Sequence, residues 1–121
     1  MAFFEIDGKE YELKLTFKSI EYLDGQFEGG SNAVIGLAIQ GSLGSFPHIV
    51  HAGLFHTEEN FSLSEIKDEI AKLIDEEKLT LEDVAKICDE VVTQSFFYKP
   101  TVDNMLKNNP EAKKALEMLR G

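Results

Sequence analysis

Apolar and polar residues alternate at the start of the chain, which is the pattern of a β-hairpin with one buried face. Phe4 and Ile6 alternate with polar neighbours before Asp7-Gly8, a dipeptide that favours a two-residue turn with positive φ angles. A turn there pairs Ile6 with Lys9 and Phe4 with Tyr11. The apolar side chains then share one face, formed by Phe4, Ile6, Tyr11, Leu13 and Leu15. Because a hairpin alone is marginally stable in water, this face must pack on the rest of the protein.

Helical spacing of apolar residues begins after Thr16, the predicted N-cap of a first short helix that stops near Gly25. Its apolar residues are Phe17, Ile20, Leu23 and Phe27. Ser31 or Asn32 is predicted to cap a second helix, which carries Ala33, Val34, Leu37 and Ala38. After a break over residues 41–45, a third helix is expected to follow Ser45, hold Pro47 in its first turn and run to about Phe55.

The second half of the chain carries stronger helix signals. Ser62-x-x-Glu65 is a capping box before a one-faced helix with Leu63, Ile66, Ile70, Leu73 and Ile74. Thr80-x-x-Asp83 repeats the signal for a fifth helix, which is expected to end before Pro100, at the Phe96-Phe97-Tyr98 cluster. Its apolar residues are Leu81, Val84, Ile87 or Cys88, Val91 and Val92. Asn109-Pro110 opens a last helix with Ala112, Ala115, Leu116 and Leu119 on one face.

These elements predict a predominantly helical α+β protein. No repeat or low-complexity linker divides the chain, and 121 residues with 43% apolar content suit one core. We therefore expect a single domain over residues 1–121, with a hairpin over residues 1–16 and about five to six short helices over residues 17–120.

Charge and cysteine content narrow the classes of function. Twenty-two acids against twelve bases give a net charge of -10, which argues against binding to nucleic acid or to anionic membranes. The N-terminus lacks the features of a signal peptide, and no apolar stretch is long enough to span a membrane. The single cysteine, Cys88, cannot form an intrachain disulfide. These features predict a soluble protein of a reducing cytoplasm.

Residues 29–57 contain no charged side chain and lie between two acidic regions. Uncharged helices in small domains are usually core, so one interpretation is a buried helical pair. The alternative is that part of the segment stays exposed and receives an apolar partner helix or a neighbouring subunit. The candidate partner-binding residues in that case are Val34, Leu37, Ile49 and Leu54.

The three histidines are the only candidate metal ligands with a suggestive spacing. His48 and His51 lie one helical turn apart, and His56 follows. No cysteine or acid occupies a neighbouring helical position, so packing or surface roles are predicted for them instead. No metal site or cofactor is expected.

Candidate catalytic motifs are incomplete. Cys88 lies on an acidic amphipathic helix, where a small buried hydrophobe is expected rather than a nucleophile. The six-residue stretch 36–41 has the glycine spacing of a P-loop, but Ser42 stands where the lysine is needed. Ser31 half-matches a nucleophile elbow but does not follow a strand. No catalytic residue is therefore predicted.

Residues 4–23 resemble the start of the tail assembly chaperones of long-tailed bacteriophages, especially those of Gram-positive hosts and their prophages. The shared pattern is a hairpin of the form apolar-x-apolar-x-Gly-Lys-x-Tyr-x-apolar, which leads into an aromatic-rich helix. Residues 52–56, followed by the acidic helix that begins at Leu63, are also similar. The likeness covers about the first 75 residues and extends to the rest only in helical character.

The resemblance implies a non-enzymatic protein of the host bacterial cytoplasm that is not expected in the mature virion. Such proteins coat the tape measure protein and keep it soluble until tail tube subunits polymerise around it. A longer form commonly arises by ribosomal frameshifting near the end of the reading frame, and Lys113-Lys114 is compatible with such a site. The implied partners are the tape measure protein, the tail tube protein and a frameshifted longer form of the chain.

The physical pattern agrees with this role. A tape measure protein presents long helices with apolar stripes, and its binder needs apolar grooves together with strong solubility. Many copies along one partner also favour a homo-oligomer. The main alternative is a small adaptor or completion protein that acts through one fixed interface, and a small enzyme is the third interpretation.

Overall fold

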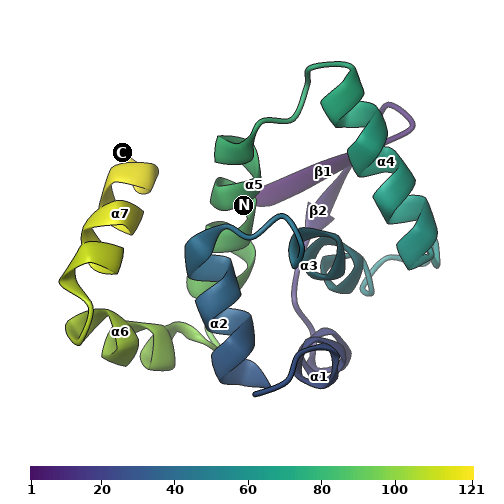
Figure 1. Cartoon of the computed structure of the whole chain (residues 1–121). Helices are drawn as coiled ribbons and strands as arrows, with labels where there is room; N and C mark the ends of the chain where they lie inside the picture. The colour runs from purple at the N-terminus through teal and green to yellow at the C-terminus, as the bar shows by residue number, and fades with distance from the viewer.

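A computed structural model describes all 121 residues and shows an N-terminal hairpin followed by seven α-helices and one π-helix (Figure 1). The α+β class is confirmed, with more helices than the five to six expected. The elements are β1 (Ala2–Ile6), β2 (Lys9–Leu13), α1 (Phe17–Gln26), α2 (Ser31–Gln40), α3 (Phe46–Gly53), α4 (Leu63–Asp75), α5 (Leu81–Cys88), η1 (Asp89–Thr93), α6 (Lys99–Lys107) and α7 (Pro110–Arg120). None of these helices has the length and hydropathy that a membrane crossing requires.

The hairpin has the predicted register. Ile6 pairs with Lys9 and Phe4 with Tyr11 in an antiparallel ladder. Asp7 and Gly8 form the turn with φ angles of 51° and 81°. The predicted face is confirmed, because Phe4, Ile6 and Leu13 are buried while Tyr11 and Leu15 pack partly buried against the core.

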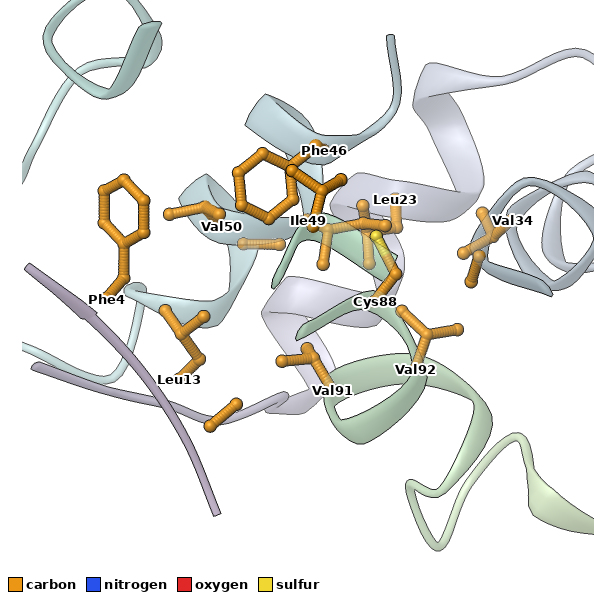
Figure 2. Packing of buried hydrophobic residues seen from close by; sticks show 14 of the residues in the cluster. Phe4, Leu13, Leu23, Val34, Phe46, Ile49, Val50, Cys88, Val91 and Val92 are labelled. Carbon is orange, nitrogen blue, oxygen red and sulfur yellow. The ribbon is translucent and has the colours of Figure 1, made fainter. Parts of the chain in front are cut away.

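Helix α3 lies at the centre of the molecule. Its buried residues are Phe46, Ile49, Val50, Ala52 and Gly53. It contacts β2, α1, α4, α5 and η1. Figure 2 shows Phe46 and Val50 facing the hairpin residues Phe4 and Leu13, and Ile49 lying beside Cys88. The core is therefore built on the uncharged segment, as the first interpretation of residues 29–57 requires.

Polar contacts fix the neighbouring elements on α3. Ser19 Oγ, on the buried side of α1, donates a hydrogen bond of 2.7 Å to the carbonyl oxygen of Ala52. The backbone N–H of Lys14, just after β2, donates to the carbonyl oxygen of Gly53 at 2.9 Å. Gly53 is closely covered, since an added Cβ would lie 3.1 Å from Cβ of Leu13. The hairpin and α1 thus dock at the same end of α3.

The predicted N-caps at Thr16, Ser62 and Thr80 are confirmed, and each forms a capping box with the residue three positions later. The predicted cap of the second helix is wrong. Gly30, with φ 62°, is the N-cap of α2, and neither Ser31 nor Asn32 caps it. Ser31 Oγ instead donates to Asp24 Oδ1 at 3.0 Å, which links the start of α2 to α1.

The region of the predicted fifth helix divides into several elements. Helix α5 continues as the π-helix η1, and the chain turns before Tyr98, which is 2% exposed. Pro100 was expected to lie beyond a helix end, but it lies in the first turn of α6. Proline is tolerated there because the first backbone N–H groups of a helix have no intrahelical partner. The sequence interpretation therefore missed α6.

Four residues assigned to apolar helix faces are exposed instead, namely Phe17, Ile74, Leu81 and Ala115. Phe17 and Leu81 are the first residues of α1 and α5, and their side chains are 78% and 69% exposed. Ile74 near the end of α4 is 42% exposed. Apolar spacing identified the helices correctly, but it does not tell how far along each helix the packed partner extends.

The turn at Gly8 gives a direct test of the hairpin. Gly8→Val places a β-branched residue at positive φ and should lower the free energy of unfolding by about 1 to 3 kcal/mol. Chemical denaturation monitored by circular dichroism measures this change. Asp7→Asn is the matched control, since asparagine tolerates the left-handed region. Equal stability of Gly8→Val and the wild type would contradict the turn.

Candidate functional site

The four candidate partner-binding residues do not share an exposed surface. Val34, Ile49 and Leu54 are 1%, 1% and 3% exposed and belong to the hydrophobic core, whereas Leu37 is partly exposed. These three side chains therefore lie in the core and do not form part of an outward face. This burial supports the core interpretation of residues 29–57, and partner binding by this segment stays a prediction.

His48 and His51 belong to an aromatic cluster between α1 and α3. The Tyr22 hydroxyl and His48 Nδ1 are 2.8 Å apart and form a hydrogen bond. The Tyr22 ring also packs edge-on against His51, with ring centroids 5.3 Å apart, and against Phe55 at the same separation. His56 lies apart from the cluster, where its Nε2 donates to the carbonyl oxygen of Glu12 at 2.7 Å. The structure shows no group of three or more His, Cys, Asp or Glu side chains placed to hold a metal ion.

The surroundings of the two clustered histidines favour their neutral forms. Burial lowers the pKa of His48, and the positive charge of Lys67 lowers it further. Burial also lowers the pKa of His51, to which the nearby His48 adds. Nδ1 of His51 is buried without a hydrogen-bond partner. These rings therefore act as packing groups between α1 and α3.

Cys88 is a core residue. Its side chain is fully buried, and Figure 2 shows it among Ile49, Val92 and Leu23. Burial raises the pKa of the thiol to about 12, and the negative charge of Asp89 contributes to the rise. Because the thiolate is the reactive form, this cysteine is unsuited to nucleophilic chemistry.

Asp89, the residue after Cys88, carries a buried carboxylate that the sequence did not single out. Arg120 at the end of α7 binds it with two hydrogen bonds, from Nε to Oδ2 at 2.9 Å and from Nη2 to Oδ1 at 2.8 Å. Thr93 Oγ1 donates to Oδ1, and Gln94 Nε2 donates to Oδ2 at 2.6 Å. The Asp89 side chain is 2% exposed and that of Arg120 is 37% exposed.

The ion pair keeps Asp89 charged despite its burial. Burial by itself raises the pKa of a carboxyl group, but the hydrogen bonds from Arg120, Thr93 and Gln94 and the charge of Arg120 outweigh it. The net result is a lowered pKa of Asp89. The same hydrogen bonding raises the pKa of Arg120. Arg120 thus supplies the positive charge that balances the buried carboxylate of Asp89.

A large cavity lies beside this ion pair, and both Asp89 and Arg120 line it. It has a volume of about 800 Å³ and is bounded by α5, η1 and the end of α7. The lining includes Glu82, Lys86, Asp89 and Glu90 from α5 and η1, and Met118 from α7. The cavity is mainly polar, and it contains no nucleophile paired with a base.

The histidine cluster generates a prediction about pH. Because the folded state lowers the pKa of His48 and His51, it binds fewer protons than the unfolded chain, whose histidines titrate near 6.5. Stability from these residues is present above pH ~6.5 and is lost as the pH falls through their folded pKa values. The melting temperature should therefore fall by a few degrees between pH 7 and pH 5.

The double variant His48→Gln/His51→Gln should lose most of this pH dependence, whereas His56→Gln, outside the cluster, should retain it. Thermal melts of the three proteins across this range measure the effect. A double variant as acid-sensitive as the wild type would rule the cluster out as its cause.

Comparison with known proteins identifies the family. No curated protein and no solved structure gave a match. The family model described as "Phage tail assembly chaperone protein, TAC" matches residues 3–107, which extend from β1 to the end of α6. The match confirms the resemblance of the hairpin and first helices and carries it across the second half of the molecule. The chain belongs to the phage tail assembly chaperone family.

Proposed function

We propose that this tail assembly chaperone binds the tape measure protein of its phage and keeps it soluble until the tail tube forms around it. The family match over residues 3–107 carries the proposal. We further infer a non-enzymatic role in the host cytoplasm, outside the mature virion and without metal or cofactor. Contacts with the tail tube protein, with a longer frameshifted form and with further copies of the chain belong to the same proposal.

The surface chemistry supports binding to an apolar partner. Several large apolar side chains are exposed, among them Phe96 at 97%, Phe17 at 78% and Met118 at 73%. Exposed apolar groups on a soluble protein are typical of interaction sites. The net charge of -10 opposes aggregation of such a protein and of its complexes. A protein that shields apolar helices from water needs both properties.

The direct test is co-expression of the chain with the tape measure protein encoded beside it. We expect the tape measure protein to move from the pellet to the supernatant and to co-purify with tagged chaperone. Ile49→Asp is the folding control, because an unpaired charge in the core costs several kcal/mol and should abolish both effects. Asn32→Asp, at an exposed position in the first turn of α2 and outside the four candidate residues, should retain them.

The mass of the purified complex separates the chaperone from the adaptor interpretation. A chaperone that coats a long helical protein should bind in many copies, whereas an adaptor with one fixed interface should bind once at a defined site. Light scattering on the eluted complex measures the ratio. A tape measure protein that stays insoluble, or one that carries a single copy, would contradict the proposed function.

A further inference from the structure

Helix α7 is attached to the molecule by few groups. Figure 1 shows it standing at one side of the body, joined to α6 by a short connection. It contacts α5 and α6. Among its 11 residues only Leu116 is fully buried. Leu116 belongs to the hydrophobic core, Ala112 and Leu119 pack partly buried against it, and the other side chains of α7 are exposed, so α7 is held to the molecule by one narrow apolar face.

Two side chains of α7, one helical turn apart, make its most buried apolar contact and its ion pair with the rest of the molecule, while Ala112 and Leu119 pack partly buried against the core. Leu116 is buried, and Arg120, four residues later, holds the Asp89 carboxylate with its two hydrogen bonds. Residues at positions i and i+4 lie on the same face of a helix. An apolar residue followed one turn later by an arginine is therefore the pattern that this part of the surface accepts.

The surface under α7 is a groove, which we call the α5–η1 groove and define by Glu82, Lys86, Asp89, Glu90 and Gln94. The adjoining cavity of about 800 Å³ shows that α7 fills only part of it. Glu82 has a cation of its own, since its Oε1 lies 3.4 Å from Nζ of Lys86. The partner of Asp89, by contrast, comes from α7. Without α7 the groove would present three acids against Lys86 and the N-terminal ammonium of Met1, which lies 3.7 Å from Oε2 of Glu90, and Asp89 would lose its cationic partner.

The family match separates the groove from its cover. Residues 3–107 include all of the α5–η1 groove, whereas α7 lies beyond the matched part. The matched part therefore contains Asp89 but not Arg120. A helix with one apolar face and a basic residue has the charge and shape to occupy the α5–η1 groove, as α7 does in this structure.

We propose that α7 is a displaceable cover of the α5–η1 groove, and that a helix of the tape measure partner replaces it by presenting an apolar residue and an arginine one turn apart. The proposal rests on the proposed function for the identity of the partner. Asp89 then exchanges the guanidinium of Arg120 for that of the partner. Binding competes with closure of α7, so weakening the contacts of α7 strengthens the binding of the partner.

The two members of one ion pair thus have opposite effects on binding. Arg120→Ala loosens the cover and should raise the affinity for the tape measure protein about tenfold. Asp89→Asn in the Arg120→Ala background, where the cover is already loosened, removes only the contact with the partner and should lower the affinity at least tenfold relative to Arg120→Ala alone. Lys114→Ala removes an exposed charge from α7 outside the groove and is the matched control, with no change expected. Binding isotherms with the tape measure protein fused to a solubility tag provide the measurement, and circular dichroism checks each fold.

The outcomes distinguish this inference from the proposed function. If the wild type binds but Arg120→Ala weakens the complex or leaves it unchanged, the cover is refuted while the chaperone role stands. Leu116→Ala also loosens α7 and should raise the affinity for the tape measure protein, as Arg120→Ala does. The inference can therefore be tested even if the variant with Asp89→Asn does not fold. If no variant binds, both proposals fail. Dimers that form through exchanged α7 helices without the tape measure protein, and that Arg120→Ala dissolves, would assign the groove to a second copy instead.

Discussion

Burial of an uncharged helix at the centre of the molecule is the constraint on which the rest of the structure depends. Helix α3 meets the hairpin, α1, α4, α5 and η1, and five of its eight residues are buried, while Pro47, His48 and His51 are partly exposed. A charge placed at one of the buried positions would be desolvated without a partner. This burial explains why α3 lacks charged residues although the protein has a net charge of -10. The acids lie instead on the outer faces of elements that turn their apolar side toward α3.

The elements that could be predicted from the sequence are those set by local chemistry. The Asp7-Gly8 turn fixes the hairpin register, because a one-residue shift would reverse the face of every side chain. The caps at Ser62 and Thr80 depend on hydrogen bonds to residues three positions away. Both kinds of signal lie within a few residues of the structure they determine. The turn and the helix caps therefore form in the folded protein as the sequence predicts.

The features that were missed depend on contacts between distant residues or on ambiguous local signals. A proline can follow the end of a helix or occupy the first turn of one. Only the burial of Tyr98 and Val102 shows that Pro100 begins α6 and that this helix packs on the core. The pairing of Asp89 with Arg120 joins residues 31 positions apart, and no spacing rule predicts it. The one available signal was an acid next to Cys88 and Val91 on the apolar side of a predicted helix. Such an acid requires a partner when it is buried.

The fold therefore consists of a tightly packed centre and a lightly attached C-terminal helix. Local stability in proteins follows the number of buried contacts, so α3 should open only with global unfolding and α7 much more readily. This difference links the architecture to assembly. A chaperone must hold its partner and later release it, and a cover that competes with the partner provides a route for release without disturbing the core.

Hydrogen exchange on the chaperone with and without bound tape measure protein tests this account most directly. The amides of α3 provide an internal reference, since they should stay protected in both states. We expect binding to slow amide hydrogen exchange in α5 and η1 and to accelerate it in α7. An α7 that becomes more protected in the complex, or that is unchanged while the partner is bound, would contradict it.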